Sequence, residues 1–113
     1  MKNKPKPADL RESASRAAQF LRLLANENRL AILCALDEGE RSVGDLAAEL
    51  DTSQPNVSQH LAKLRALDLV TSRRSGTNVL YALRDRDAAA VIAILYRRYC
   101  APAKSGAARR RAA

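Results

Sequence analysis

Two cysteines, Cys34 and Cys100, are the side chains of this chain best suited to covalent chemistry. They lie in the segments RLAILCAL and AILYRRYC, 66 residues apart, and the 113 residues contain no other cysteine. A thiolate is a nucleophile, so two thiols brought together could switch between a reduced and a bridged form. Free cysteine is also among the most buried residue types, and composition alone favours two small core residues without a chemical role.

Other covalent or metal chemistry has little support in the residue types. His60 is the only histidine and has no cysteine within helical reach, so a zinc site cannot be assembled around it. The chain also lacks the close Cys-X-X-Cys pair of thiol–disulfide enzymes. We therefore predict no catalytic residue, no metal site and no cofactor, and expect His60 to contact DNA or to lie partly exposed on a helix.

A second group of polar residues has the pattern of a DNA-reading helix. Ser42 and Asp45 have capping-box spacing and start a short helix, and a three-residue turn leads to SQPNVSQHLAKLRAL, with Pro55 in the first turn of a longer helix. In such a helix-turn-helix, the N-terminal residues of the second helix enter the major groove. The predicted contacts to bases and phosphates are Ser53, Gln54, Asn56, Ser58, Gln59, His60 and Lys63.

The remaining elements must hold these two groups of residues in place. Apolar spacing predicts a first helix after an Asp9 cap and a second from an Asn26 cap to about Leu36. The runs LVTSRR and NVLYAL around SGT predict a β-hairpin, a wing with Arg73 and Arg74 at its tip as further DNA contacts. An Asp85 cap begins a last helix, residues 88–100, which is apolar on nearly every face and therefore needs cover from another subunit.

The basic charge of the chain is unevenly distributed. Seven of the eight net positive charges belong to residues 1–7 and 101–113. Within the rest, residues 37–51 hold six acidic side chains against one arginine, whereas residues 52–84 hold five basic side chains against one aspartate. A contiguous basic stretch over the predicted DNA-reading unit points to nucleic acid more strongly than the overall charge does.

These observations predict one domain between two basic tails. Residues 1–8 are expected to be a disordered arm, residues 9–100 a DNA-binding and dimerisation domain, and residues 101–113 a disordered tail. No apolar run is long enough to span a bilayer and no secretory signal precedes the domain, so a cytoplasmic location is expected, where both cysteines would stay reduced.

The segments LLANENRLAILCAL and SVGDLAAELDTSQPNVSQHLAKLRALDLVTSRRSGTNVLYAL, with the closing helix, resemble the ArsR/SmtB family of winged-helix repressors. The resemblance covers about residues 10–100. It implies a mainly helical winged helix-turn-helix fold with the order helix, helix, helix, helix, strand, strand, helix. It also implies a homodimer through the first and last helices that binds double-stranded operator DNA with imperfect palindromic symmetry.

The chain departs from the metal-sensing members of that family. The helix that carries a cysteine pair in arsenic, cadmium and lead sensors reads SVGDLA, and no histidine follows Asp85 and Asp87 where zinc and nickel sensors need several. Neither family metal site can form.

Cys34 and Cys100 instead resemble the cysteine pair of the family's persulfide-sensing branch, in which sulfur bridges the pair and DNA is released. The resemblance thus implies a repressor of sulfide-response genes induced by reactive sulfur species. Four alternatives stay open: a peroxide-responsive disulfide switch, a regulator with inert cysteines that antagonises another DNA-binding protein, a thiol–disulfide enzyme, and an architectural protein held on DNA by its tails.

Overall fold

Most helices of this protein begin at a polar side chain that accepts a free backbone N–H group. The structure is a computed structural model that describes residues 6–100. Helix α2 (Glu27–Asp37) starts after Asn26, and α3 (Val43–Glu49) starts with a capping box between Ser42 and Asp45. Ser53 caps α4 (Gln54–Ala66), and Asp85 caps α5 (Arg86–Leu95). The predicted caps Asn26, Ser42 and Asp85 are confirmed, whereas Ser53 had been predicted as a DNA contact and not as a cap.

The first helix begins earlier than predicted. Helix α1 runs over Pro7–Leu24, its N-cap is Lys6 without a side-chain hydrogen bond, and Asp9 lies in its first turn. Proline suits this first position because its missing N–H would have no partner there. The prediction that Asp9 caps the helix was therefore wrong, and residues 7 and 8 belong to α1 rather than to an arm. The predicted tail over residues 101–113 and the arm over residues 1–5 lie outside the described residues.

The sheet has one strand more than the predicted hairpin. Strands β2 (Val70–Ser75) and β3 (Asn78–Leu83) pair antiparallel around Gly76, and β1 (Arg41–Ser42) pairs with the other edge of β3. Gly76 has a φ of 64°, which glycine adopts without strain. Arg73 and Arg74 lie within β2, opposite Leu80 and Val79, so their predicted place at the tip was wrong.

The hydrophobic core is formed by α2, α3, α4, α5 and the base of the hairpin. Val57, Leu61 and Leu64 are at most 1% exposed, as the spacing of apolar residues in this helix predicts. The other buried apolar residues are Leu24, Ile32, Leu33, Leu36, Leu46, Ala47, Leu69, Val70, Ala88 and Ile92. This cluster fixes α4 and the hairpin relative to α2.

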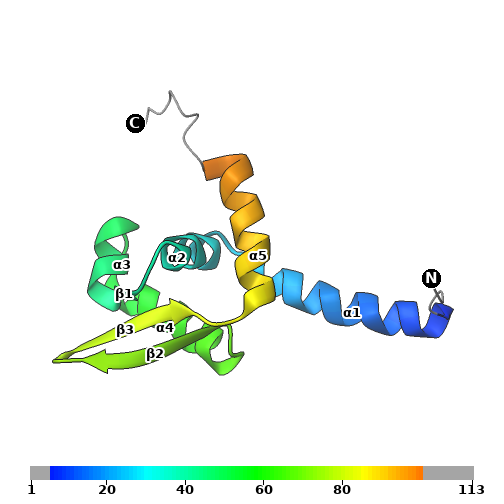
Figure 1. The fold of residues 1–113 in the computed structure, drawn as a ribbon, viewed down its shortest axis with the longest axis horizontal. Helices are drawn as coiled ribbons and strands as arrows, with labels where there is room; N and C mark the ends of the chain where they lie inside the picture. The colour runs from blue at the N-terminus through cyan, green and yellow to red at the C-terminus, as the bar shows by residue number, and fades with distance from the viewer. Residues whose placement is uncertain (1–5, 101–113) are drawn as a thin grey trace.

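Helices α1 and α5 keep apolar side chains in solvent. Helix α1 projects from the rest of the fold (Figure 1), and Leu24 is its only buried residue. Leu10, Leu21 and Ile94 are 53–55% exposed. None of the described helices is both long enough and apolar enough to cross a membrane.

The last helix is not uniform. Helix α5 ends at Leu95 and continues as a five-residue π-helix, η1 (Tyr96–Cys100). The prediction of one α-helix to Cys100 was wrong in this turn. The segment contains no glycine or proline, so its residue types do not signal the change.

Candidate DNA interface and cysteine pair

Helix α4 presents a polar outer face beside the wing. Gln54, Ser58, Gln59 and Lys63 are exposed, and none of them has a side-chain hydrogen bond within residues 6–100. They are available to a partner, as predicted for contacts to DNA.

Two of the predicted DNA contacts are engaged within the fold. The Ser53 hydroxyl accepts the backbone N–H of Asn56 at 3.1 Å. The Asn56 side chain is half-buried and donates to the Thr52 hydroxyl at 3.0 Å. Both side chains stabilise the start of α4.

His60 lies on the inner side of α4. It follows Val57 by three residues and precedes Leu64 by four, which places it on the face of the buried residues. Its Nδ1 is buried without a hydrogen-bond partner, and burial, with Arg29 and Lys63 nearby, lowers the pKa of the imidazole. His60 is therefore half-buried at the edge of the inner face of α4, with Arg29 of α2 nearby, in agreement with the predicted alternative of a partly exposed helix residue.

The two wing arginines differ. The Arg73 guanidinium donates to both carboxylate oxygens of Glu40, each at 2.7 Å, and this contact lowers the pKa of Glu40. Arg74 is exposed and makes no ion pair with any residue that the structure describes. Of the pair, Arg74 is the one free to bind a phosphate.

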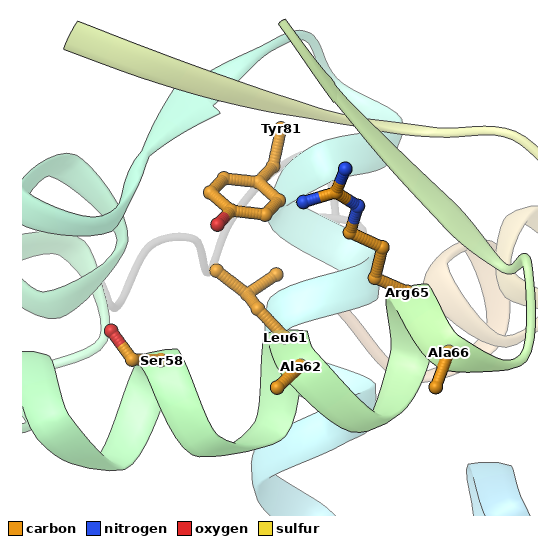
Figure 2. A pocket seen from close by; sticks show the side chains of 6 residues that line it. All are labelled: Ser58, Leu61, Ala62, Arg65, Ala66 and Tyr81. Atoms are coloured by element: carbon orange, nitrogen blue, oxygen red, sulfur yellow. The ribbon is translucent and has the colours of Figure 1, made fainter.

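A groove between α4 and β3 contains residues that the sequence did not single out. Figure 2 shows it lined by Ser58, Leu61, Ala62, Arg65, Ala66 and Tyr81. Its volume is about 430 Å³. Arg65 and Tyr81 were missed because only the pairing of β3 with β2 and its packing over α4 bring them together.

The fold brings the two cysteines together. Cys34 lies half-buried on α2, and Cys100 lies exposed at the end of η1, both as free thiols. Burial, followed by the neighbouring thiol of Cys100 and the carboxylates of Asp37 and Glu38, raises the pKa of Cys34 to about 11. Cys34 is therefore protonated at neutral pH, next to a thiol that solvent reaches.

A small cavity opens beside Cys34. It measures about 280 Å³ and lies between α2, the end of α3 and Tyr96, with Glu38 and Glu49 among its lining residues. The neighbouring carboxylate of Glu38 raises the pKa of Tyr96. A small reagent thus has room beside the half-buried thiol of Cys34. Across residues 6–100, the His, Cys, Asp and Glu side chains form no cluster of three that could hold a metal ion.

Residues 26–72 match the family described as "Bacterial regulatory protein, arsR family". The transcriptional activator HlyU of Vibrio cholerae is 42% identical, over 81% of this chain and 85% of its own length. The biofilm growth-associated repressor of Agrobacterium fabrum is 42% identical, over 87% of this chain and 83% of its own length.

Solved structures share the fold. The transcriptional repressor BigR from Xylella fastidiosa aligns with a TM-score of 0.79 and 35% identity, covering 89% of this chain and all of that one. Reduced HlyU from V. cholerae aligns with a TM-score of 0.76 and 42% identity, covering 80% of this chain and 96% of that one. The match confirms the predicted winged helix-turn-helix fold.

Proposed function

The chain belongs to the arsR family of bacterial regulatory proteins, and we propose that it is a dimeric repressor that reactive sulfur species release from operator DNA through Cys34 and Cys100. Membership in a family of regulators sets aside the alternative of a thiol–disulfide enzyme. The relatives named above include a repressor and an activator. The exposed apolar residues of α1 and α5 support a dimer through these helices.

The observation that carries the proposal is the neighbouring position of the two thiols. Cys100 is exposed and Cys34 is half-buried beside a cavity, so Cys100 reacts first with a dissolved persulfide. The Cys100 thiolate attacks the outer sulfur of R–S–SH, and R–S⁻ leaves with a proton as R–SH. Cys34, after its thiol has lost its proton, acquires a sulfur from a second persulfide, and a second R–SH leaves.

The two cysteine persulfides then condense. The deprotonated persulfide of Cys34 attacks the Sγ of Cys100, and HS⁻ leaves as H₂S after protonation. The product is a trisulfide, Cys34–S–S–S–Cys100. Two thiols and two persulfides thus yield one trisulfide, two R–SH and one H₂S, without a further oxidant.

A bridge at this place reaches the DNA-binding helix through α2. Cys34 is on α2, which packs against both α4 and α5. A link from α2 to the end of η1 therefore constrains the helix that packs against α4. A coupling of about 1–3 kcal/mol lowers operator affinity about 5- to 150-fold, which is sufficient for a switch.

The test uses duplexes enriched by the protein from a randomised library. An alkyl persulfide should release the enriched duplex from the wild-type chain, and intact mass should show added sulfur between Cys34 and Cys100. Cys34→Ser and Cys100→Ser should each bind the duplex normally and not respond. Zinc, cadmium and arsenite, run as controls, should not release it.

Three outcomes would contradict the proposal. If the library yields no enriched sequence, the protein has no specific operator. If persulfide releases DNA from either single-cysteine variant, the cysteine pair is not the sensor. Release by peroxide but not by persulfide, with a simple disulfide in the product, would favour the peroxide-responsive alternative.

A further inference from the structure

Three of the six residues that line the groove between α4 and the wing have side-chain hydrogen-bond donors. Ser58 and Arg65 stand on α4, two helical turns apart, and Tyr81 stands on β3. In Figure 2, the Tyr81 ring descends from β3 toward α4 and the Arg65 guanidinium extends from α4 toward the sheet. Ala62 and Ala66 leave the floor between them open.

These donors have no acceptor within the described part of the chain. No carboxylate of residues 6–100 pairs with Arg65, whereas Arg41 and Arg73 are held by Glu49 and Glu40. The Tyr81 and Ser58 hydroxyls make no hydrogen bond to residues 6–100. No acidic residue lines the groove. A guanidinium and two hydroxyls without acceptors fit an anionic oxygen ligand.

We propose that Arg65 and Tyr81 bind a backbone phosphate of the DNA, with Ser58 at the other end of the same groove. The proposal rests on the proposed function, which places α4 in the major groove. A duplex with α4 in its major groove and the wing alongside must carry one strand's backbone past the gap between them. The arginine and the tyrosine line that gap. Arg73 does not compete for the phosphate because Glu40 holds it.

This contact positions the protein and does not read sequence. Phosphate contacts contribute equally to the affinity for all duplexes. Each phosphate neutralised steepens the slope of log K against log salt concentration by about 0.9. Arg65→Ala should therefore weaken an enriched and a scrambled duplex by the same factor, about tenfold or more, as for a lost charge-assisted hydrogen bond. Tyr81→Phe should weaken both duplexes less and leave the salt dependence nearly unchanged.

The decisive experiment places neutral methylphosphonates at single positions of the enriched duplex. Wild-type protein should lose affinity at one phosphate in each half-site. In Arg65→Ala the same methylphosphonate should cause no further loss of affinity, because the arginine that contacts this phosphate is already absent. Arg65→Lys should restore the salt dependence. Arg11→Ala is the control of equal charge, on the helix that projects away from α4 and the wing (Figure 1).

Several results would overturn the proposal. One is an affinity of Arg65→Ala within twofold of wild type, with unaltered thermal unfolding. Equal sensitivity of wild type and Arg65→Ala at every methylphosphonate is another. A change of base preference in Arg65→Ala would mean that the groove reads bases. If the wild-type chain binds neither duplex, the proposed function itself fails. If it binds both duplexes and Arg65→Ala does not change the affinity, only the proposal for Arg65 fails.

Discussion

Single residues decide which charges of the wing are free for DNA. Glu40 and Arg73 form a two-bond ion pair on the surface, and Arg73 remains 58% exposed. Such a pair contributes little to folding, but it occupies a guanidinium that could bind phosphate. Glu40→Gln should free Arg73 and raise affinity for DNA of any sequence, with a salt slope steeper by up to about 0.9 for each phosphate gained.

Titrations of both duplexes against salt measure this effect. Glu27→Gln is the matched control, since it removes one exposed carboxylate from the first turn of α2 without breaking an ion pair within residues 6–100. Arg73→Ala should change affinity less than Arg74→Ala does. Equal losses in the two arginine variants would mean that DNA displaces Glu40.

The two thiols should differ in reactivity. The pKa of Cys34 is raised to about 11, first by burial, so its folded form holds the proton tightly. The protonated Cys34 thiol contributes fully to the free energy of unfolding below the ordinary pKa of a thiol. This contribution is lost as the pH rises through about 11. Iodoacetamide at neutral pH should label exposed Cys100 before Cys34, as peptide mass spectrometry can show.

The pH dependence provides the control for that prediction. In Cys100→Ser, burial still raises the pKa of Cys34, so its labelling should accelerate only well above the ordinary thiol range. Labelling of Cys34 ahead of Cys100 at neutral pH would reverse the order of attack that we propose.

At the scale of elements, α1 and α5 expose the surface that a second subunit would cover. Leu21 and Ile94 are each more than half exposed, on the two helices with the least cover. An aspartate at either position should raise the dimer Kd. A loss of about 2 kcal/mol of dimerisation free energy at each of two symmetric sites corresponds to a roughly thousandfold increase in the dimer Kd. Light scattering after size-exclusion chromatography measures the mass, with Ala48→Asp on α3 as the control. A dimer that survives both changes would contradict this interface.

The sequence predicted the elements with local signals and missed those that depend on distant partners. The caps Asn26, Ser42 and Asp85 and the inward residues of α4 were visible because helices repeat locally. Strand β1 is two residues long and exists through its pairing with β3. The Glu40–Arg73 ion pair joins residues 33 apart in the chain, which no local spacing indicates.

The candidate site divides in the same way. The outer residues of α4 followed from the helix-turn-helix pattern. For His60 the sequence left two alternatives, a DNA contact or a partly exposed helix residue, and its half-buried position agrees with the second. The cysteine pair needed the family resemblance, because the packing of α5 on α2 brings these thiols together and no spacing does.

At the scale of the whole molecule, charge is separated from recognition. Residues 8–100 carry a net charge of only +1, and six lysines and arginines lie in residues 1–5 and 101–113. Charges outside the winged helix can add contacts to phosphates, which carry no sequence information directly. We therefore predict that the tails add affinity without specificity.

Deleting residues 1–5 and 101–113 tests this separation, since it leaves α1 and its Lys6 cap intact. The truncated chain should bind a scrambled duplex more weakly, with a shallower salt slope, because fewer counterions are released. Its ratio of affinities for enriched and scrambled duplexes should hold or rise. A full-length chain with the six basic residues replaced by glutamine should behave alike, which would assign the effect to charge rather than length. A fall of the ratio in both proteins would mean that the tails contact bases, and the winged helix would then not be the only reader of the operator.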